Sequence, residues 1–212
     1  MFYLIITSCL NNRYGIIDFE DRKKRYINCI ETAKLINKEL NNQIKIIIVE
    51  NNGSRNTFLD ELEVDVLYTE NNKYYCPNPH LHKGVVEFMD IKDVINKYNI
   101  HDDDIVIKLT GRYKLLNSNF LKLILENNNN YDVFMKFFNV SRSIFKKDDC
   151  VMGLYGIRCK YLKEFQFNLP RRSAECNLAT FIRENINNDK ICEVNTLNLE
   201  CKFADDHRIA NI

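Results

Sequence analysis

Short apolar runs alternate with longer amphipathic segments in the first half of the chain. Runs rich in Ile, Val, Leu and Tyr, bounded by polar clusters, predict β-strands at residues 2–7, 43–50, 64–69 and 104–109. Apolar side chains at near-helical spacing predict helices over 19–40 and 83–99, and a short helix at 56–62. Strands that alternate with helices pair in parallel through right-handed crossovers. The pattern therefore predicts an α/β fold with a largely parallel sheet.

The second half of the chain has shorter elements. The pattern predicts a helix at 119–126, strands at 131–138 and 150–157, a helix at 174–186, and a late strand pair or one long edge strand over 191–203. Residues 70–82 hold two of the three prolines and show little periodicity, so they are expected to form a loop. The length of 212 residues fits one domain, 1–212.

Composition excludes several classes of protein. With 30 basic and 29 acidic side chains, the formal charge of +1 argues against a general electrostatic grip on nucleic acid. No stretch approaches the roughly 20 apolar residues of a membrane span, and the apolar start lacks the basic region of a signal peptide. The eight cysteines are scattered without close pairs, which favours reduced thiols over disulfides or structural zinc. We expect a soluble, cytoplasmic protein.

Polar residues follow three of the predicted strands at their carboxyl ends, where open α/β sheets bind ligands. They are Thr7, Ser8 and Arg13 after the first strand, Glu50, Asn51 and Asn52 after the second, and Thr110, Gly111, Arg112 and Tyr113 after the fourth. Arg112 suits a two-pronged grip on phosphate, and Lys108 or Lys83 would add charge. Gly111 would let backbone approach closely. This set favours a small anionic ligand such as a diphosphate; the alternative is an ordinary turn with a solvated arginine.

The order of these motifs resembles the GT-A glycosyltransferases. The matching stretches are Thr-Ser-x-x-x-x-Arg after the first strand, IKIIIVENN, VLYT, HKGVVE and DDDIVIKLTGRY. The chain is similar in particular to GT-A-like proteins of bacteria and large DNA viruses whose fourth strand ends in Lys-x-x-Gly-Arg-Tyr. The likeness covers roughly residues 1–113, a nucleotide-binding half, and continues more loosely into 114–212, an acceptor-side half. It implies a GT-A-like fold, a UDP- or GDP-linked sugar donor, a carbohydrate or glycoconjugate acceptor and, for a viral chain, the host cytoplasm.

The resemblance also implies roles for individual residues. Thr7, Ser8 and residues 50–52 would lie around the base and ribose, while Lys83, Gly84 and Glu87 would flank the nucleotide. The chain departs from the family at the end of the fourth strand. Where the family has Asp-x-Asp to hold a divalent metal on the diphosphate, this chain has Leu109-Thr110-Gly111, followed by Arg112.

Diphosphate charge must still be neutralised as the sugar leaves. We expect Arg112, with Lys108 or Lys83, to replace the metal, which predicts a metal-independent enzyme. The alternative is a Mn²⁺ or Mg²⁺ ion on Asp205, Asp206 and His207. The acidic run 102–104 stands at the amino end of its strand, away from the expected site.

Inverting sugar transfer needs a base for the acceptor hydroxyl. The resemblance points to Glu175, which opens the late helix; the alternative is that Glu175 only complements the helix dipole. Asp149, with Asp148, is the next candidate, as base or as a ligand for acceptor hydroxyls. Arg171 and Arg172 are candidates to meet phosphate or an acidic acceptor, and Tyr113 and Tyr155 to stack on a sugar.

Two further classes of function stay open. A non-catalytic nucleotide-sugar or glycan-binding module would explain the missing Asp-x-Asp. A sugar nucleotidyltransferase shares the layered α/β plan but should have a glycine-rich phosphate loop after the first strand, and TSCLNNRYG lacks one.

Overall fold

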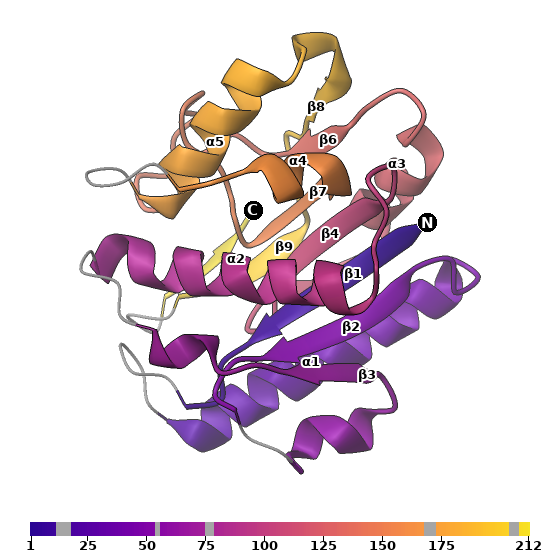
Figure 1. The fold of residues 1–212 in the computed structure, drawn as a ribbon, viewed down its shortest axis with the longest axis vertical. Coiled ribbons are helices and arrows are strands. Elements are labelled where there is room, and N and C mark those ends of the chain that lie inside the picture. The colour runs from indigo at the N-terminus through magenta and orange to yellow at the C-terminus, as the bar shows by residue number, and fades with distance from the viewer. Residues whose placement is uncertain (12–17, 54–55, 75–78, 168–172, 204–207) are drawn as a thin grey trace.

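The computed structural model describes residues 1–11, 18–53, 56–74, 79–167, 173–203 and 208–212. Within these residues the chain forms a central sheet of seven strands in the order β3-β2-β1-β4-β7-β6-β8 (Figure 1). The strands are β1 (Phe2–Ser8), β2 (Lys45–Glu50), β3 (Asp65–Tyr68), β4 (Ile105–Thr110), β6 (Val133–Met135), β7 (Leu154–Arg158) and β8 (Ile191–Glu193).

The first-half strands pair as the sequence predicts. β1 lies between β2 and β4 and is parallel to both, and β2 is parallel to β3. β7 is antiparallel to β4 and β6, while β8 returns parallel to β6. The expected α/β fold with a largely parallel sheet is therefore confirmed, and the carboxyl ends of β1, β2 and β4 meet at one edge.

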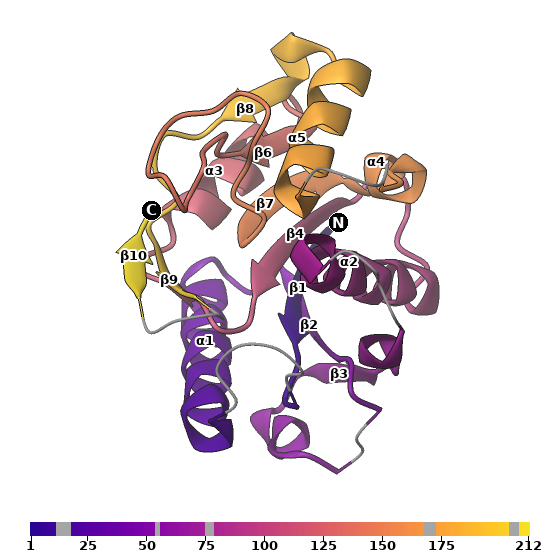
Figure 2. The ribbon, with the colours of Figure 1, turned by 90° about the vertical axis from the view of Figure 1, so that its left-hand side faces the viewer.

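Helices cover both faces of this sheet (Figures 1 and 2). They are α1 (Phe19–Glu39), α2 (Pro79–Lys97), α3 (Asn119–Asn127), α4 (Cys159–Glu164) and α5 (Ala174–Asn185). Leu4 and Ile6 of β1 pack on the side of α1 and α3, while Tyr3 and Ile5 pack on the side of α2, α4 and α5. Strands buried on both faces need apolar residues at every position, which explains the unbroken apolar runs. No helix among the described residues is long and apolar enough to span a membrane.

A small antiparallel sheet lies beside α1 (Figure 2). It consists of β5 (Lys114–Leu115), β9 (Leu199–Lys202) and β10 (Ile209–Asn211). Short 3₁₀ helices complete the described chain: η1 (Phe58–Leu62), η2 (Asn71–Lys73) and η3 (Asn188–Lys190).

Several predicted boundaries were wrong. The expected loop 70–82 contains η2 and the first turn of α2, which begins at Pro79, a residue suited to the first position of a helix. The segment 191–203 is neither a strand pair nor one long strand, because β8 and β9 belong to different sheets. β7 begins at Leu154 instead of residue 150, and β6 is only three residues long. Residues 102–104 precede β4, at its amino end as expected.

Candidate functional site

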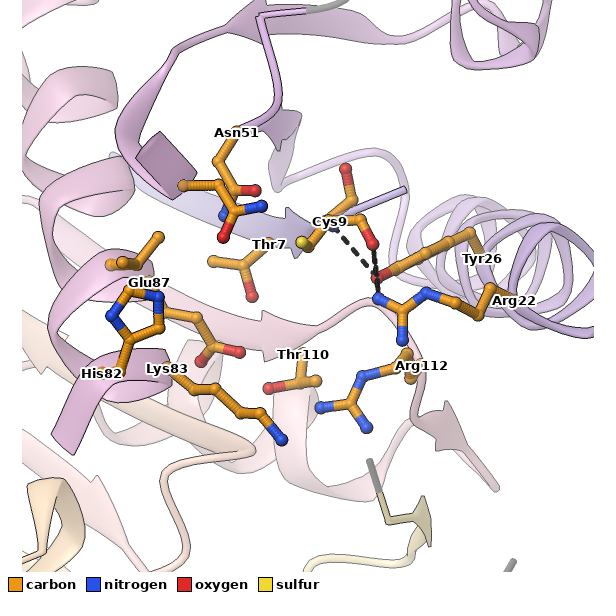
Figure 3. Close-up of a pocket in the computed structure, with 13 residues that line it drawn as sticks. Thr7, Cys9, Arg22, Tyr26, Asn51, His82, Lys83, Glu87, Thr110 and Arg112 are labelled. Carbon is orange, nitrogen blue, oxygen red and sulfur yellow. Dashed lines mark hydrogen bonds between the residues drawn. The ribbon is translucent and has the colours of Figure 1, made fainter. Parts of the chain in front are cut away.

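Two adjoining cavities lie at the carboxyl ends of β1, β2 and β4. The smaller, of about 50 Å³, is lined by residues of β1, α1, α2 and β4, by Asn51, which follows β2, and by Asn72 of η2 (Figure 3). The larger, of about 330 Å³, extends toward α5 and the residues before β7. Lys83, Glu87, Thr110 and Arg112 line both cavities and so form their common wall. Nucleotide and sugar sites of open α/β sheets occupy this edge.

Glu50, at the end of β2, organises the turn that follows β1. Its carboxylate is fully buried and accepts hydrogen bonds from Ser8 Oγ at 2.5 Å and from the backbone N–H of Leu10 at 3.1 Å. It also accepts from Asn52 Nδ2 at 2.5 Å. Glu50 and Asn52 thus lie behind the smaller cavity, whereas Ser8 lines it. A buried carboxylate supplied with several donors fixes the geometry of the loop around it.

Asn51 and Thr7 both line the smaller cavity. Asn51 Nδ2 donates to Asp90 Oδ2 at 2.9 Å, and Asp90 also accepts from Thr69 Oγ1 at 2.9 Å and Asn71 Nδ2 at 2.8 Å. Burial raises the pKa of Asp90 to about 7, against these three hydrogen bonds. With its amide nitrogen committed, Asn51 keeps Oδ1 for another group. Among described residues, neither Asn51 Oδ1 nor Thr7 Oγ1 has a hydrogen-bond partner, although both are buried.

Lys108 supports the common wall from inside. Its side chain is 1% exposed, and Nζ donates to Glu87 Oε2 at 2.6 Å, Thr110 Oγ1 at 2.5 Å and the carbonyl of Met152 at 2.7 Å. A lysine ammonium has three protons, so these partners use all of them. Lys108 therefore holds Glu87 and Thr110 in place, and its charge is already opposed by a carboxylate.

Arg112 lies between the two cavities. Its Nη1 donates to the carbonyl of Lys202 at 3.0 Å, and its guanidinium lies 5.6 Å from the centre of the Tyr113 ring. Tyr113 packs against Gly153, where an added Cβ would come within 2.2 Å of the ring. Tyr113 lines the larger cavity from this fixed position. The end of β4 thus presents a cation between the two cavities.

Two glycines serve close packing between elements. An added Cβ at Gly111 would lie 2.7 Å from the Tyr26 ring and 2.9 Å from the carbonyl oxygen of Thr7, so Gly111 lets the end of β4 approach α1. An added Cβ at Gly84 would lie 2.2 Å from the Cβ of Ala174. The crossing of α2 and α5 at Gly84 brings the first turn of α5 to the larger cavity, which both Gly84 and Glu175 line.

The two carboxylates expected to act in catalysis both line the larger cavity. Glu175 stands in the first turn of α5, which Ser173 caps by accepting from the N–H of Cys176 at 3.2 Å. Burial raises the pKa of Glu175, reinforced by the nearby charges of Asp149 and Glu87 and opposed by hydrogen bonds from its own N–H and from Ser173. Asp149 is buried and accepts from Asn139 Nδ2 at 2.6 Å.

Two other candidates lie elsewhere. Asp148 lines a separate surface depression with Phe145 and Arg183. Tyr155 is fully buried in the core, so it does not present its ring to a sugar.

Sequence reasoning missed Arg22, a second arginine on the smaller cavity. Arg22 belongs to α1, is 4% exposed, and donates to the carbonyl of Cys9 and to Tyr26 Oη, the latter at 3.0 Å. A signal was present, because Arg22 precedes Tyr26 by four residues and so shares the buried face of the helix. Charged residues are rarely fully buried unless they are paired, so an arginine on that face is informative.

Some expected residues lie outside the part of the chain that the structure describes. They are Arg13, Arg171, Arg172, Asp205, Asp206 and His207. In the described part, no group of three or more His, Cys, Asp or Glu residues could hold a metal ion. At the end of β4 the donor set is Thr110 and Arg112 in place of carboxylates, which does not fit a divalent cation.

Comparisons with known proteins reveal the fold. No family model matches the sequence, and no curated protein matches it. A putative nucleotide-diphospho-sugar transferase from Desulfovibrio desulfuricans matches with a TM-score of 0.56 at 8% identity, over 91% of this chain and 78% of that one. A cytidylyltransferase from Leptospira borgpetersenii gives 0.52 at 15% identity, over 91% and 74%.

A 4-diphosphocytidyl-2C-methyl-D-erythritol synthase gives a TM-score of 0.53 at 10% identity, over 93% of this chain and 91% of that one. At such low identities these matches show the fold and nothing finer. The chain has the mixed α/β fold of nucleotide-diphospho-sugar transferase-like proteins, with the largely parallel sheet that the sequence predicts.

Proposed function

We propose that this chain is a glycosyltransferase that takes a sugar from a nucleotide-sugar, UDP- or GDP-linked, and places it on a carbohydrate or glycoconjugate acceptor. The observation that carries the proposal is the pair of joined cavities with Arg112 on their common wall. In this arrangement the nucleoside side lies toward β1 and β2, the diphosphate lies at the wall, and the sugar extends toward Glu175.

The polar groups of the smaller cavity support its use for the nucleoside. Asn51 Oδ1 and Thr7 Oγ1 lack partners in the described chain, and a nucleoside offers base N–H and ribose hydroxyl groups to them. Buried polar atoms in proteins are nearly always satisfied, so two such oxygens beside one cavity favour a polar ligand. Ser8, also on the cavity, is oriented by Glu50.

The charges along the cavities support the proposed orientation of the nucleotide-sugar, with its diphosphate at the common wall. Among the described residues, Arg22, Lys83 and Arg112 line the smaller cavity with one carboxylate, Glu87, which is paired with Lys108. A leaving nucleoside diphosphate gains negative charge as the glycosidic bond breaks, and cations fixed in advance stabilise that charge. We propose that Arg112 and Lys83 perform this role without a divalent metal.

The carboxylates of the larger cavity support the chemical step. In the proposed reaction Glu175 accepts the proton of an acceptor hydroxyl, and that oxygen bonds to the anomeric carbon from the face opposite the diphosphate. As that bond forms, the bond between the anomeric carbon and the diphosphate oxygen breaks and the nucleoside diphosphate leaves, which inverts the anomeric centre. A base is most effective when its pKa approaches the working pH, and burial moves Glu175 in that direction. Asp149 is proposed to bind acceptor hydroxyls.

Nucleotidyl transfer is the second candidate. It is favoured by matched structures described as a cytidylyltransferase and as a 4-diphosphocytidyl-2C-methyl-D-erythritol synthase. That reaction would transfer the nucleoside monophosphate group of a nucleoside triphosphate to the phosphate of a phosphorylated acceptor and release pyrophosphate. A module that binds the nucleotide-sugar without turnover is the third candidate.

One product assay separates the three. Purified protein is incubated with UDP- and GDP-sugars plus a panel of glycan acceptors, and separately with nucleoside triphosphates plus sugar phosphates, and products are identified by mass spectrometry. We expect a nucleoside diphosphate and a glycosylated acceptor, absent with Glu175→Gln. Pyrophosphate and a new nucleotide-sugar would establish nucleotidyl transfer instead, and binding without either product would support the non-catalytic module.

A further inference from the structure

Arg22 is a buried cation and Arg112 a half-buried one. Among the described residues, the Arg22 guanidinium donates to two neutral oxygens, the carbonyl of Cys9 and the Tyr26 hydroxyl, and its Nε has no partner. Arg112 bonds to the carbonyl of Lys202. Neither arginine forms an ion pair with any residue that the structure describes. An uncompensated buried charge is costly, so this arrangement favours an anion that is bound during function.

The two guanidinium groups line the same cavity. Both act on the hydroxyl of Tyr26, whose pKa burial raises to about 12 while the positive charges of Arg22 and Arg112 oppose the rise. Figure 3 shows the two groups on the same side of the cavity, with Arg22 coming from α1 and Arg112 from the end of β4. Two like charges at one site repel each other unless a ligand of opposite charge lies between them.

We propose that Arg22 and Arg112 together bind the two phosphates of a diphosphate group. This deepens the proposed function, on which it rests for the identity of the attached nucleoside. Guanidinium groups donate in parallel pairs to phosphate oxygens, so two of them can grip adjacent phosphates. Because α1 follows the turn after β1, the ligand would also tie that turn to the end of β4.

A purely structural role for Arg22 is the competing explanation. Its bonds to Cys9 and Tyr26 pin the turn after β1, and a neutral donor of similar reach would serve that purpose as well. An anion site, in contrast, needs the positive charge. Replacing Arg22 by a neutral donor therefore separates the two roles.

The test uses inorganic pyrophosphate, which carries the diphosphate chemistry without a nucleoside. Calorimetric titration in EDTA compares wild type with Arg22→Gln, Arg112→Gln and Lys24→Gln. Lys24 is the matched control, since it removes one positive charge from an exposed position on the same helix. We expect Arg22→Gln and Arg112→Gln each to weaken binding about tenfold or more, the usual effect of losing a hydrogen bond between charged groups. Lys24→Gln should stay within about twofold of wild type.

Wild-type affinity in a folded Arg22→Gln variant would overturn the proposal, as would a wild-type protein that does not bind pyrophosphate. If Arg22→Gln does not fold, Arg22→Lys replaces it. That variant keeps the charge but loses the paired donors, so weaker pyrophosphate binding is expected and unchanged affinity would refute the proposal. Pyrophosphate binding that depends on both arginines, with no sugar transfer, would uphold this site while refuting the glycosyltransferase. Sugar transfer at the wild-type rate in Arg22→Gln would uphold the glycosyltransferase while refuting this diphosphate site.

Discussion

The crossing of α2 and α5 at Gly84 gives a sharp prediction. An added methyl group at Gly84 would stand 2.2 Å from the Cβ of Ala174. Carbon atoms in contact lie about 3.5–4.0 Å apart, so the helices must separate by roughly 1.5 Å to admit it. Overpacking of this kind costs about 1–3 kcal/mol. The gain from replacing glycine by alanine in a helix offsets about 0.5–1 kcal/mol of that cost.

We therefore expect Gly84→Ala to lower the free energy of unfolding by about 1–2 kcal/mol in urea titrations. Ala174→Gly removes the opposing methyl, so the double variant Gly84→Ala/Ala174→Gly should be more stable than the sum of the single changes implies, by about 1 kcal/mol or more. The single variant Ala174→Gly completes the double-mutant cycle from which this coupling is calculated. A Gly84→Ala variant as stable as wild type, with no coupling to Ala174, would refute the packing that we describe and the positioning of Glu175 that depends on it.

Three other predictions concern buried charges. Burial raises the pKa of Asp90 to about 7, so between about pH 4 and pH 7 the native state holds more protons than the unfolded chain. The free energy of unfolding should therefore fall as pH rises through that window, by at most about 4 kcal/mol. Asp90→Asn should flatten this dependence in urea titrations at several pH values, and an unchanged slope would contradict it. Lys108→Met leaves the carboxylate of Glu87 without its ion pair and should lower the free energy of unfolding by about 3 kcal/mol. The double variant Lys108→Met/Glu87→Gln should recover part of this loss. A Lys108→Met variant as stable as wild type would count against the pairing. Glu175→Gln should lower kcat about 10²–10⁴-fold with donor affinity unchanged. As pH is lowered, wild-type activity should start to fall at a higher pH than it would with an ordinary glutamate as base, because the pKa of Glu175 is raised. A Glu175→Gln enzyme that keeps its activity would show that Glu175 is not the base.

The sheet was predictable because its strands are buried on both faces. β1, β2 and β4 read as short apolar runs, and the helices between them imply parallel order. β10 escaped detection because Ile209–Asn211 is only three residues long and pairs with β9 alone. The start of α2 was missed because two prolines suggested a loop, although a proline also suits the first turn of a helix.

The gathering of candidate residues was predictable where position along a strand determines it. Residues that end parallel strands must meet at one edge, so the sequence places Thr7, Asn51 and Arg112 together, and in the structure they line one cavity. The hydrogen bonds of the Lys108 ammonium could not be predicted from the sequence, because its partners Glu87 and Met152 are brought to it only by folding. The sequence predicts that Gly111 lets backbone approach closely, and the structure shows that the carbonyl oxygen of Thr7 and the Tyr26 ring are the groups that come close to it.

The central claim is a nucleotide-sugar site in which Arg112 takes the place of a metal. Calorimetric binding of UDP, GDP and their common sugars, in EDTA and then with Mn²⁺, on wild type and Arg112→Ala, tests it most directly. The account predicts binding that persists in EDTA and weakens at least about tenfold in Arg112→Ala. Binding that requires Mn²⁺ would contradict the role of Arg112, and no nucleotide binding under either condition would contradict the site itself.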